Sequence, residues 1–412
     1  MRLLFCVQRY GEEVAGGSEA ACRQVAEHLA ARGHLVEVVT SRAKSYVDWA
    51  DHYPAGPTTL NGVVVHRLSV RQPRDPKQFG PLHGRILRTR RAPLFVQRDW
   101  LRLQGPDVPG LPLWLDANAE RFDLANFFTY LYPTTAFGLP VAARRLPTIL
   151  FPTAHEEPMM ELRVFDELVR AADGLLCLTP EELELVAQRF RFTPRAEVIG
   201  LGVDQNPVGD GRRFRDAHGL GDEPYVIFVG RIDPGKGSDE LHRYFIEHKR
   251  RHPSNLRLVV VGEPVTQLPP HDDVILTGFV DEQTKLDALA GATLLVQPSY
   301  FESFSLALCE GWTFGLPALV QRQCKVLDGQ VRRAGGGLPY SGFAEFSEAL
   351  ALLLREPGLR AQMGEGGRKY VRTHYAWDSV MNNYERFARG VIDATSYAAE
   401  QSRTRSSPTG PD

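Results

Sequence analysis

Short apolar runs alternate with helix-length segments along most of the chain. In the first half an amphipathic segment at residues 18–31 predicts a helix, and the apolar runs lie at residues 3–7, 36–39, 63–68, 122–128, 148–151, 174–178 and 196–199. Runs of this kind that alternate with helices predict a parallel sheet covered by helices on both faces. We therefore expect a doubly wound α/β domain over residues 1–205.

A second series of apolar runs begins after a polar stretch that contains Gly and Pro. This stretch, residues 206–223, lacks periodicity and predicts an interdomain linker. The later runs lie at 225–229, 256–261, 274–276 and 292–296. A second doubly wound domain is therefore expected over residues 224–375. A helical segment follows at 376–395, and the Ser-, Thr- and Arg-rich residues 396–412 predict a disordered tail.

The composition is that of a soluble globular protein with more than one domain. The chain has 412 residues, of which 43% are hydrophobic, and a formal net charge of -2 at pH 7. No run approaches the roughly 20 apolar residues that a membrane span needs, and Met1 leads into an apolar run without a signal-peptide pattern. We therefore expect a cytoplasmic protein. The scattered cysteines predict small core residues rather than disulfides or a zinc site: Cys6, Cys22, Cys177, Cys309 and Cys324.

Two carboxylates lie where a buried strand is expected to pass into a helix. Glu302 falls in the loop after the apolar run 292–296. Glu310 falls inside the following helix-like segment, which Gly315 and Pro317 close. Strand carboxyl ends and helix N-termini present unpaired backbone N–H groups to anionic ligands. This stretch is therefore a candidate binding site.

A glycine-rich loop with two cations follows the first strand of the second domain. Residues 230–237 read Gly-Arg-Ile-Asp-Pro-Gly-Lys-Gly and contain Gly230, Arg231 and Lys236. Cations, and backbone amides that glycine allows to come close, suit a diphosphate. The residue order of a Walker loop is absent. The alternative is a solvated, charged turn, and the loop by itself leaves that alternative open.

The first domain offers two weaker candidates. Gly16 and Gly17 lie in the loop after the first strand and permit close approach of a ligand, with Ser18 as the expected helix N-cap; the alternative is a flexible connection. A dinucleotide fingerprint is missing there, which argues against an oxidoreductase. His155 follows the run 148–151, at the carboxyl edge of the expected sheet. A lone histidine at such a place is more often structural than catalytic.

The spacing Glu-x7-Glu ahead of Gly-x-Pro, together with Arg-x4-Lys in the second domain, resembles the signature of retaining GT-B glycosyltransferases of the GT4 family. The resemblance implies a GT-B fold, in which two Rossmann-like domains face each other across a cleft. It also implies that the helix 376–395 crosses back to the N-terminal domain. Two residues depart from the pattern. Ser305 stands where Gly is usual and Trp312 where small residues are usual, and we expect both to reshape the sugar pocket.

The resemblance also implies a role for each candidate residue. Arg231 and Lys236 would hold the nucleotide diphosphate and neutralise it as it leaves. Glu302 would orient the sugar hydroxyls, and Glu310 would accept hydrogen bonds from the ribose. The catalytic set is then Arg231, Lys236, Glu302 and His155, and the donor-binding set is Gly16, Gly17, Gly230, Ser303, Phe304, Ser305, Leu306 and Glu310.

The implied reaction moves a hexose from a nucleotide-diphosphate sugar to a hydroxyl acceptor, in polysaccharide or glycolipid biosynthesis. The acceptor would be a glycan, a lipid-linked saccharide or a small molecule. No Asp-x-Asp motif ends a strand and two cations can replace a divalent ion, so we expect no metal and no cofactor beyond the co-substrate. A glycosidase would leave the cationic pair without a role. A nucleotide-sugar 2-epimerase and a non-catalytic nucleotide-sugar-binding protein remain as alternatives.

Basic residues are concentrated in residues 67–114, in a chain that is slightly acidic overall. One interpretation is a solvated segment whose arginine stems cover apolar surface. The other is a docking surface for an anionic membrane face or a phosphate-bearing acceptor. Nucleic acid is not expected, because the excess is confined to one segment. The residues concerned are Arg67, Arg71, Arg74, Lys77, Arg85, Arg88, Arg90, Arg91, Arg98 and Arg102, with Phe79, Phe95, Trp100 and Trp114 among them.

Overall fold

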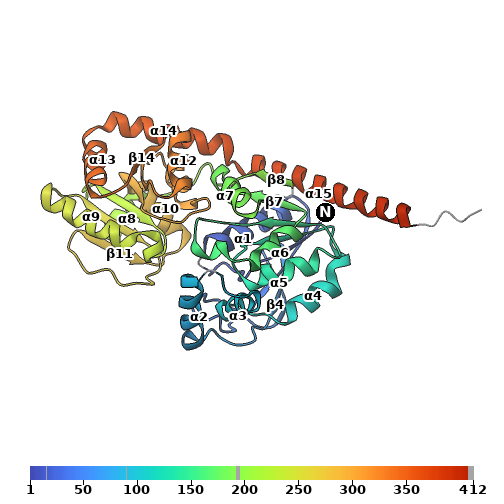
Figure 1. Cartoon of the computed structure of the whole chain (residues 1–412). Helices are drawn as coiled ribbons and strands as arrows, with labels where there is room; N and C mark the ends of the chain where they lie inside the picture. The colour runs from blue at the N-terminus through green and yellow to red at the C-terminus, as the bar shows by residue number, and fades with distance from the viewer. Residues whose placement is uncertain (15, 90, 192–194, 407–412) are drawn as a thin grey trace, which may run out of the picture. The chain divides into compact units, whose positions relative to one another are not determined.

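The chain folds into two compact units, each built around its own sheet (Figure 1). The structure is a computed structural model that describes the chain except for residues 15, 90, 192–194 and 407–412. Unit 1 comprises Met1–Leu201 and Val380–Asp412, and unit 2 comprises Gly202–Ser379. Each unit is a mixed α/β domain with a parallel sheet, as the sequence predicted.

The sheet of unit 1 has the strand order β3-β4-β2-β1-β5-β6-β7-β8. Its strands pair in parallel, apart from β3, which pairs antiparallel with β4. The predicted apolar runs all form strands, whereas β3 was missed because its Gly-Pro-Thr-Thr-Leu sequence is largely exposed and carries no apolar pattern. The strands are β1 (Arg2–Cys6), β2 (Leu35–Ser41), β3 (Gly56–Leu60), β4 (Val63–Leu68), β5 (Leu124–Phe128), β6 (Thr148–Phe151), β7 (Gly174–Cys177) and β8 (Arg195–Val198).

Helices pack on the sheet of unit 1 because its central strands are apolar on both faces. Strands β1, β5, β6 and β7 are buried almost throughout, as expected for parallel strands covered on both sides. The helices are α1 (Gly17–Ala31), α2 (Pro76–Thr89), α3 (Leu94–Gln104), α4 (Gly110–Asn118), α5 (Pro133–Ala142), α6 (Val164–Ala171) and α7 (Pro180–Phe190), with the 3-10 turns η1 (Ala119–Arg121) and η2 (Pro158–Glu161).

The sheet of unit 2 has the order β11-β10-β9-β12-β13-β14, with parallel pairing throughout its described strands. The strands are β9 (Tyr225–Val229), β10 (Arg257–Val261), β11 (Val274–Gly278), β12 (Leu294–Gln297), β13 (Ala318–Gln321) and β14 (Gly337–Tyr340). The helices are α8 (Gly211–Ala217), α9 (Ser238–Arg251), α10 (Glu282–Gly291), α11 (Leu306–Thr313), α12 (Lys325–Ala334), α13 (Phe343–Arg355) and α14 (Pro357–His374), with the 3-10 turn η3 (Pro234–Lys236).

The segment predicted as a linker, residues 206–223, is part of unit 2. Within it Asp210 caps α8 by accepting from the backbone N–H groups of Arg212 and Arg213. Helix α8 packs on α10, where Arg213 forms an ion pair with Asp287 at 2.5 Å. The division between the units therefore falls after Leu201, before the polar stretch rather than within it.

Helix α15 (Trp377–Ser406) begins in unit 2 and belongs to unit 1 from Val380 onward. The hydroxyl of Tyr384 donates to Asn126 Oδ1 at 3.0 Å, next to β1. The predicted helix ended at residue 395, whereas α15 continues to Ser406. The rest of the predicted disordered tail, residues 407–412, lies outside the described residues.

The five cysteines are unpaired and buried, which confirms that they are core residues. Over the part of the chain that the structure describes, no helix combines the length and apolarity required to cross a membrane.

Candidate functional site

The two sequence motifs of unit 2 meet at one edge of its sheet. Strands β9 and β12 are neighbours that pair in parallel, so their carboxyl ends lie side by side. The glycine-rich loop, residues 230–237, follows β9, and the loop that carries the first carboxylate, residues 298–305, follows β12. The predicted passage from strand to loop to helix is confirmed, because β12 ends at Gln297 and α11 begins at Leu306.

The two loops are in direct contact. The backbone N–H of Tyr300 donates to the carbonyl of Gly235 at 3.1 Å. Gly237 has a φ of +67°, and a Cβ added there would lie 2.3 Å from the carbonyl oxygen of Pro298. Only glycine fits this backbone without displacement of the neighbouring loop. Two motifs that are far apart in the sequence therefore form one continuous surface.

Lys236 and Glu302 form an ion pair across these loops, with 2.7 Å between Nζ and Oε1. Both side chains are mostly buried. The position of Lys236 is fixed further by Asp233, whose Oδ1 accepts from the Lys236 backbone N–H at 3.0 Å and caps η3. Partly buried, charge-assisted contacts of this length are among the stronger polar interactions in proteins. Two predicted catalytic residues are thus brought together.

Arg231 lies on the same loop, immediately after Gly230. Its Nε is 3.5 Å from Asp233 Oδ2, and the side chain is about a third exposed. A Cβ on Gly262 would lie only 1.9 Å from the carbonyl oxygen of Gly230, so the end of β10 also supports this loop. Asp233 therefore contacts the side chain of Arg231 and the backbone of Lys236.

Gln297 links Glu302 to Ser305 and was not identified from the sequence. Its Nε2 lies 3.4 Å from Glu302 Oε1 and 3.3 Å from Ser305 Oγ. Ser305 has a φ of +71°, a left-handed conformation that glycine adopts at lower cost. The Gln297 contact gives the Ser305 side chain a fixed partner in that strained position. A polar residue at the end of an apolar strand run was the available signal.

Glu310 lies on α11 and pairs with a second residue that the sequence did not reveal. Its Oε1 is 2.9 Å from Lys285 Nζ on α10. Burial alone would lower the pKa of Lys285, but the carboxylates of Glu310 and Glu282 outweigh burial and hold the pKa above its ordinary value. Lys285 therefore stays charged and fixes the Glu310 carboxylate. Residues on α10 and α11 come together only through the packing of unit 2.

The loop before α11 is held in place by Gln330 on α12. Gln330 Nε2 donates to the carbonyl of Phe304 at 2.7 Å. The Phe304 ring is buried and meets Tyr375 edge to face. The Phe304 ring is thus a packing group of unit 2, and any contact with a donor through its backbone remains a prediction. Ser303 and Leu306 flank it at the start of α11 and are partly buried.

Trp312 is a core residue, which corrects the expectation that it reshapes the sugar pocket. It is fully buried, and its Nε1 donates to the carbonyl of Gly336 at 2.9 Å. Room for the indole comes from two glycines, since a Cβ on Gly336 or Gly367 would lie within 2.7 Å of it. At 100° per residue, position 312 points about 200° away from Glu310 on the same helix.

In unit 1 the glycine loop is arranged around a buried ion pair. Arg9 Nη2 lies 2.6 Å from Glu19 Oε1, and both side chains are 5% exposed. A Cβ on Gly16 would lie 2.3 Å from Glu19 Oε2, whereas one on Gly17 would meet nothing within 4 Å. The prediction that Ser18 caps α1 is wrong. Gly16 occupies the N-cap position, and the Ser18 hydroxyl donates to Glu19 at 2.9 Å.

His155 lies in the loop after β6, at the carboxyl edge of the sheet of unit 1, as predicted. Its Nδ1 is 3.7 Å from Glu157 Oε1, which accepts from the Tyr130 hydroxyl at 2.6 Å. The loop is held by the buried Glu182, whose two oxygens accept from the backbone N–H groups of Ala154 and Leu178, each at 2.6 Å. Burial raises the pKa of Glu182 to about 8, although the two hydrogen bonds act to lower it.

The predicted site residues therefore fall into two groups. Unit 2 brings together Gly230, Arg231, Lys236, Glu302 and Ser305, with Glu310 on the adjoining helix. Unit 1 carries Gly16 and Gly17 at the start of α1, and His155 in the loop after β6. That both groups serve one donor remains a prediction. Within the described residues, no group of three or more His, Cys, Asp or Glu side chains is arranged to hold a metal ion.

Comparison with protein-family models gives two matches that together span most of the chain. A model described as Glycosyl transferases group 1 matches residues 210–370. A model described as Glycosyltransferase Family 4 matches residues 15–206. The matched regions correspond to the second and the first predicted domain.

Curated relatives match over nearly the whole length. A D-inositol 3-phosphate glycosyltransferase of Acidothermus cellulolyticus is 28% identical over 410 residues, covering 94% of this chain and 88% of that protein. A protein of the same name from Nocardia farcinica is 27% identical over 430 residues, covering 95% and 90%.

Solved structures agree in fold. Sucrose-phosphate synthase from Thermosynechococcus elongatus aligns with a TM-score of 0.70 at 19% identity, covering 96% of this chain and 100% of that one. HepE from Anabaena, solved with UDP and glucose, aligns with a TM-score of 0.68 at 16% identity, covering 95% and 100%. At such identities the likeness shows the fold, which is the predicted GT-B fold with two parallel-sheet domains.

Proposed function

This chain belongs to the glycosyl transferases group 1 family, and we propose that it is a retaining glycosyltransferase that moves a sugar from a nucleotide-diphosphate-sugar donor to a hydroxyl-bearing acceptor. The observation that carries the proposal is the 2.7 Å contact between Lys236 and Glu302, which joins the two motifs at adjacent strand ends. A cation beside a carboxylate at this edge suits a ligand that has both an anionic diphosphate and sugar hydroxyls.

The chemistry follows from the charges of these residues. Cleavage of the bond between the sugar and the diphosphate builds negative charge on the leaving phosphate. Arg231 and Lys236 supply preorganised positive charge for that phosphate, and Glu302 orients the sugar hydroxyls. A phosphate oxygen of the donor accepts the proton of the acceptor hydroxyl. The sugar is then transferred with retention of configuration and without a covalent enzyme intermediate.

Chelation is expected to leave this reaction unchanged, because two fixed cations already neutralise the leaving group. Donor hydrolysis measured with and without EDTA tests the prediction. Equal rates support a metal-independent mechanism. Loss of activity with EDTA, followed by recovery on addition of magnesium or manganese, would refute it.

The two carboxylates are expected to act on different parts of the donor. Glu310→Gln should weaken binding of the free nucleoside diphosphate by about 10- to 150-fold, because a hydrogen bond to a charged group contributes roughly 1.5–3 kcal/mol. Glu302→Gln should instead impair use of the intact sugar donor. Calorimetric titration with both ligands separates these effects. An equal loss for both ligands in both variants would show that the roles are wrongly divided.

The proposal is tested directly by screening UDP-, GDP- and ADP-sugars for binding and then for hydrolysis. Slow hydrolysis without acceptor and faster turnover with a hydroxyl acceptor support a transferase. Conversion of the donor into an isomeric sugar without any acceptor would favour the 2-epimerase alternative. Tight binding without any turnover would favour a non-catalytic nucleotide-sugar-binding protein.

A peripheral contact with an anionic membrane surface is supported by the outer side of α2 and α3, which pack together (Figure 1). Phe95 is 67% exposed, and Arg85, Arg88 and Arg91 are exposed nearby in the sequence. Exposed aromatic groups beside arginines are typical of surfaces that bind the membrane interface. Some other residues of the predicted basic segment 67–114 do not belong to this surface. Arg67 is buried and donates to the Tyr10 carbonyl, Trp100 is buried, and Arg90 lies outside the described residues.

The full-length protein is expected to sediment with anionic but not zwitterionic vesicles, with binding that fades as salt rises. Replacing Arg85, Arg88 and Arg91 by Ser should weaken vesicle binding about 100-fold, because each cation contributes about 1 kcal/mol near such a surface. A variant with three exposed arginines of α9 replaced by Ser, at positions Arg243, Arg250 and Arg251, has the same charge change and should bind normally. Absence of sedimentation at low salt would contradict the proposal.

A further inference from the structure

Unit 1 contains two adjoining pockets at the carboxyl edge of its own sheet. The larger, of about 550 Å³, is lined by Trp49 from the segment after β2, Arg71 from the segment after β4, and Arg102 from α3. The smaller, of about 310 Å³, shares Arg71, Arg102 and Asp107 with the larger and reaches the start of α5. Ligands of parallel sheets bind at this edge, because the loops that follow the strands gather there. The position therefore suits a substrate.

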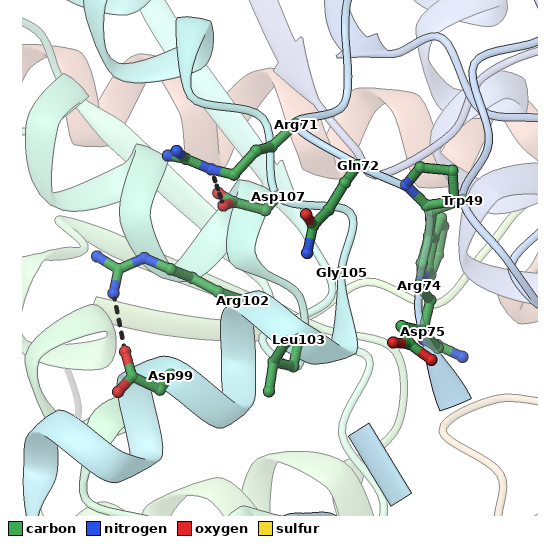
Figure 2. A pocket seen from close by; sticks show the side chains of 11 residues that line it. Trp49, Arg71, Gln72, Arg74, Asp75, Asp99, Arg102, Leu103, Gly105 and Asp107 are labelled. Atoms are coloured by element: carbon green, nitrogen blue, oxygen red, sulfur yellow. Dashed lines mark hydrogen bonds and ion pairs between the residues drawn. The ribbon is translucent and has the colours of Figure 1, made fainter. Parts of the chain in front are cut away.

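The wall that the two pockets share consists of two arginines, each fixed by an aspartate. Figure 2 shows the guanidinium ends of Arg71 and Arg102 extending in the same direction. Arg71 Nε lies 2.7 Å from Asp107 Oδ2, and Arg102 Nη1 lies 3.3 Å from Asp99 Oδ1. A guanidinium has five N–H donors, so one such contact leaves most of them for a ligand. The aspartates orient the arginines without saturating them, and exposed ion pairs of this kind contribute only about 0–1 kcal/mol.

The smaller pocket adds groups that favour an anion. Its floor includes Phe137, whose ring centroid is 5.3 Å from the guanidinium carbon of Arg102. Thr134 lies in the same wall and is 2% exposed, and its buried Oγ has no hydrogen-bond partner among the described residues. Helix α5 begins here with no acidic residue in its first turn and no side-chain cap. A helix N-terminus attracts negative charge, and a buried hydroxyl without a partner is costly.

We infer that the smaller pocket binds an anionic group, a phosphate or a carboxylate, of a hydroxylated acceptor whose remaining part occupies the larger pocket. Arg71 and Arg102 hold the anion, and Thr134 donates its hydroxyl to it. In the larger pocket Gln72 and Asp75 offer an amide and a carboxylate for sugar or polyol hydroxyls. This inference rests on the proposed function, because it assigns the acceptor of that transfer reaction.

Binding is measured first, in a form that does not depend on turnover. Glucose 6-phosphate, gluconate and glucose are titrated calorimetrically into the full chain in a Lys236→Ala background, which weakens the expected diphosphate site. We expect at least one anionic probe to bind about tenfold or more tightly than glucose, since hydrogen bonds to charged groups contribute most. Preference for glucose 6-phosphate identifies a phosphate site, and preference for gluconate identifies a carboxylate site.

Variants assign the binding to this pocket. Replacing both arginines, Arg71→Gln and Arg102→Gln, should lower the affinity for the anionic probe about 100-fold. The nearly isosteric Thr134→Val should lower that affinity severalfold. Arg145→Gln is the matched control, because Arg145 forms an exposed ion pair with Asp116 elsewhere in unit 1. It should bind the probe as the unchanged protein does. Equal affinity for glucose and both anions, or an unchanged affinity in the double variant, would overturn the inference.

Transfer assays separate this inference from the proposed function. With an active donor, phosphorylated or carboxylated acceptors should have a kcat/KM at least tenfold above that of their neutral counterparts, mainly through KM. Donor turnover with no preference for anionic acceptors would refute the inference and leave the proposed function standing. Anion binding at the pocket without turnover of any nucleotide sugar would refute the proposed function alone.

Discussion

Lys236→Ala is expected to lower donor turnover by about 100-fold or more while the protein stays folded. Removal of one preorganised group from a developing anion costs roughly 3–4 kcal/mol. Lys236 is held for this role from two sides, by Glu302 through its side chain and by Asp233 through its backbone. Arg231→Ala should have an effect of similar size, because the same loop carries both cations. Steady-state hydrolysis of the donor measures the loss.

Two controls make this result specific. Lys369→Ala removes an exposed lysine of α14 in the same unit and should leave turnover unchanged. The double variant Lys236→Ala with Glu302→Gln tests coupling, because the single Lys236 change leaves a mostly buried carboxylate without its cation. If the two residues act as one unit, the double variant loses clearly less than the sum of the two single losses, whereas an additive loss would show that they act independently. Normal turnover in both Lys236→Ala and Arg231→Ala would remove the basis of the proposed function.

The sequence predicted most strands that are buried on both faces, although β13 was not among the predicted runs. Such strands are continuous apolar runs, and β1, β5, β9 and β12 were recognised for that reason. The edge strands β8 and β11 were predicted, but the edge strands β3 and β14 were missed. Strand β3 is largely exposed, and β14 reads Gly-Leu-Pro-Tyr, which contains two turn-forming residues. Proline is tolerated at the edge of a sheet because one side of an edge strand needs no backbone donor.

The candidate site was predicted as motifs but not as contacts. Lys236 and Glu302 could be named because each lies in a recognisable local pattern after a strand. Their ion pair depends on β9 and β12 being neighbours in the sheet, which local patterns do not encode. Lys285 has no local signature, and the only local sign of Gln297 is its place as a polar residue at the end of an apolar strand. Each acquires its place from helix packing or from the end of a strand.

Trp312 shows why an unusual residue cannot be assigned to a pocket from its size alone. Its bulk, at a position where the family pattern has small residues, suggested a role in the sugar pocket. The α-helical period turns the two side chains to opposite sides. The sequence also contains the two small residues that make room for this side chain, because Gly336 and Gly367 leave the volume that the indole fills. Recognising it requires knowledge that α14 and Gly336, the residue before β14, pack against α11.

Trp312→Ala is therefore expected to destabilise unit 2 by about 3–5 kcal/mol, because it removes a fully buried indole and leaves a cavity that two glycines cannot fill. The hydrogen bond to the Gly336 carbonyl is lost as well. Trp312→Phe should cost less, since the ring keeps part of the volume. Denaturant unfolding measures the change in the free energy of unfolding for both variants. As a control, Val208→Ala, at a residue that is 79% exposed in the same unit, should change this free energy by no more than about 0.5 kcal/mol.

The stability of Trp312→Ala also decides between the two interpretations of this residue. A core residue loses stability, while donor affinity per folded molecule stays close to normal, because its side chain points away from Glu310. A residue of the sugar pocket would show the reverse, with normal unfolding and a donor KM raised severalfold. Measuring donor binding at a temperature well below the unfolding transition keeps the two effects apart. Unchanged stability together with weakened donor binding would restore the pocket interpretation and contradict the packing described here.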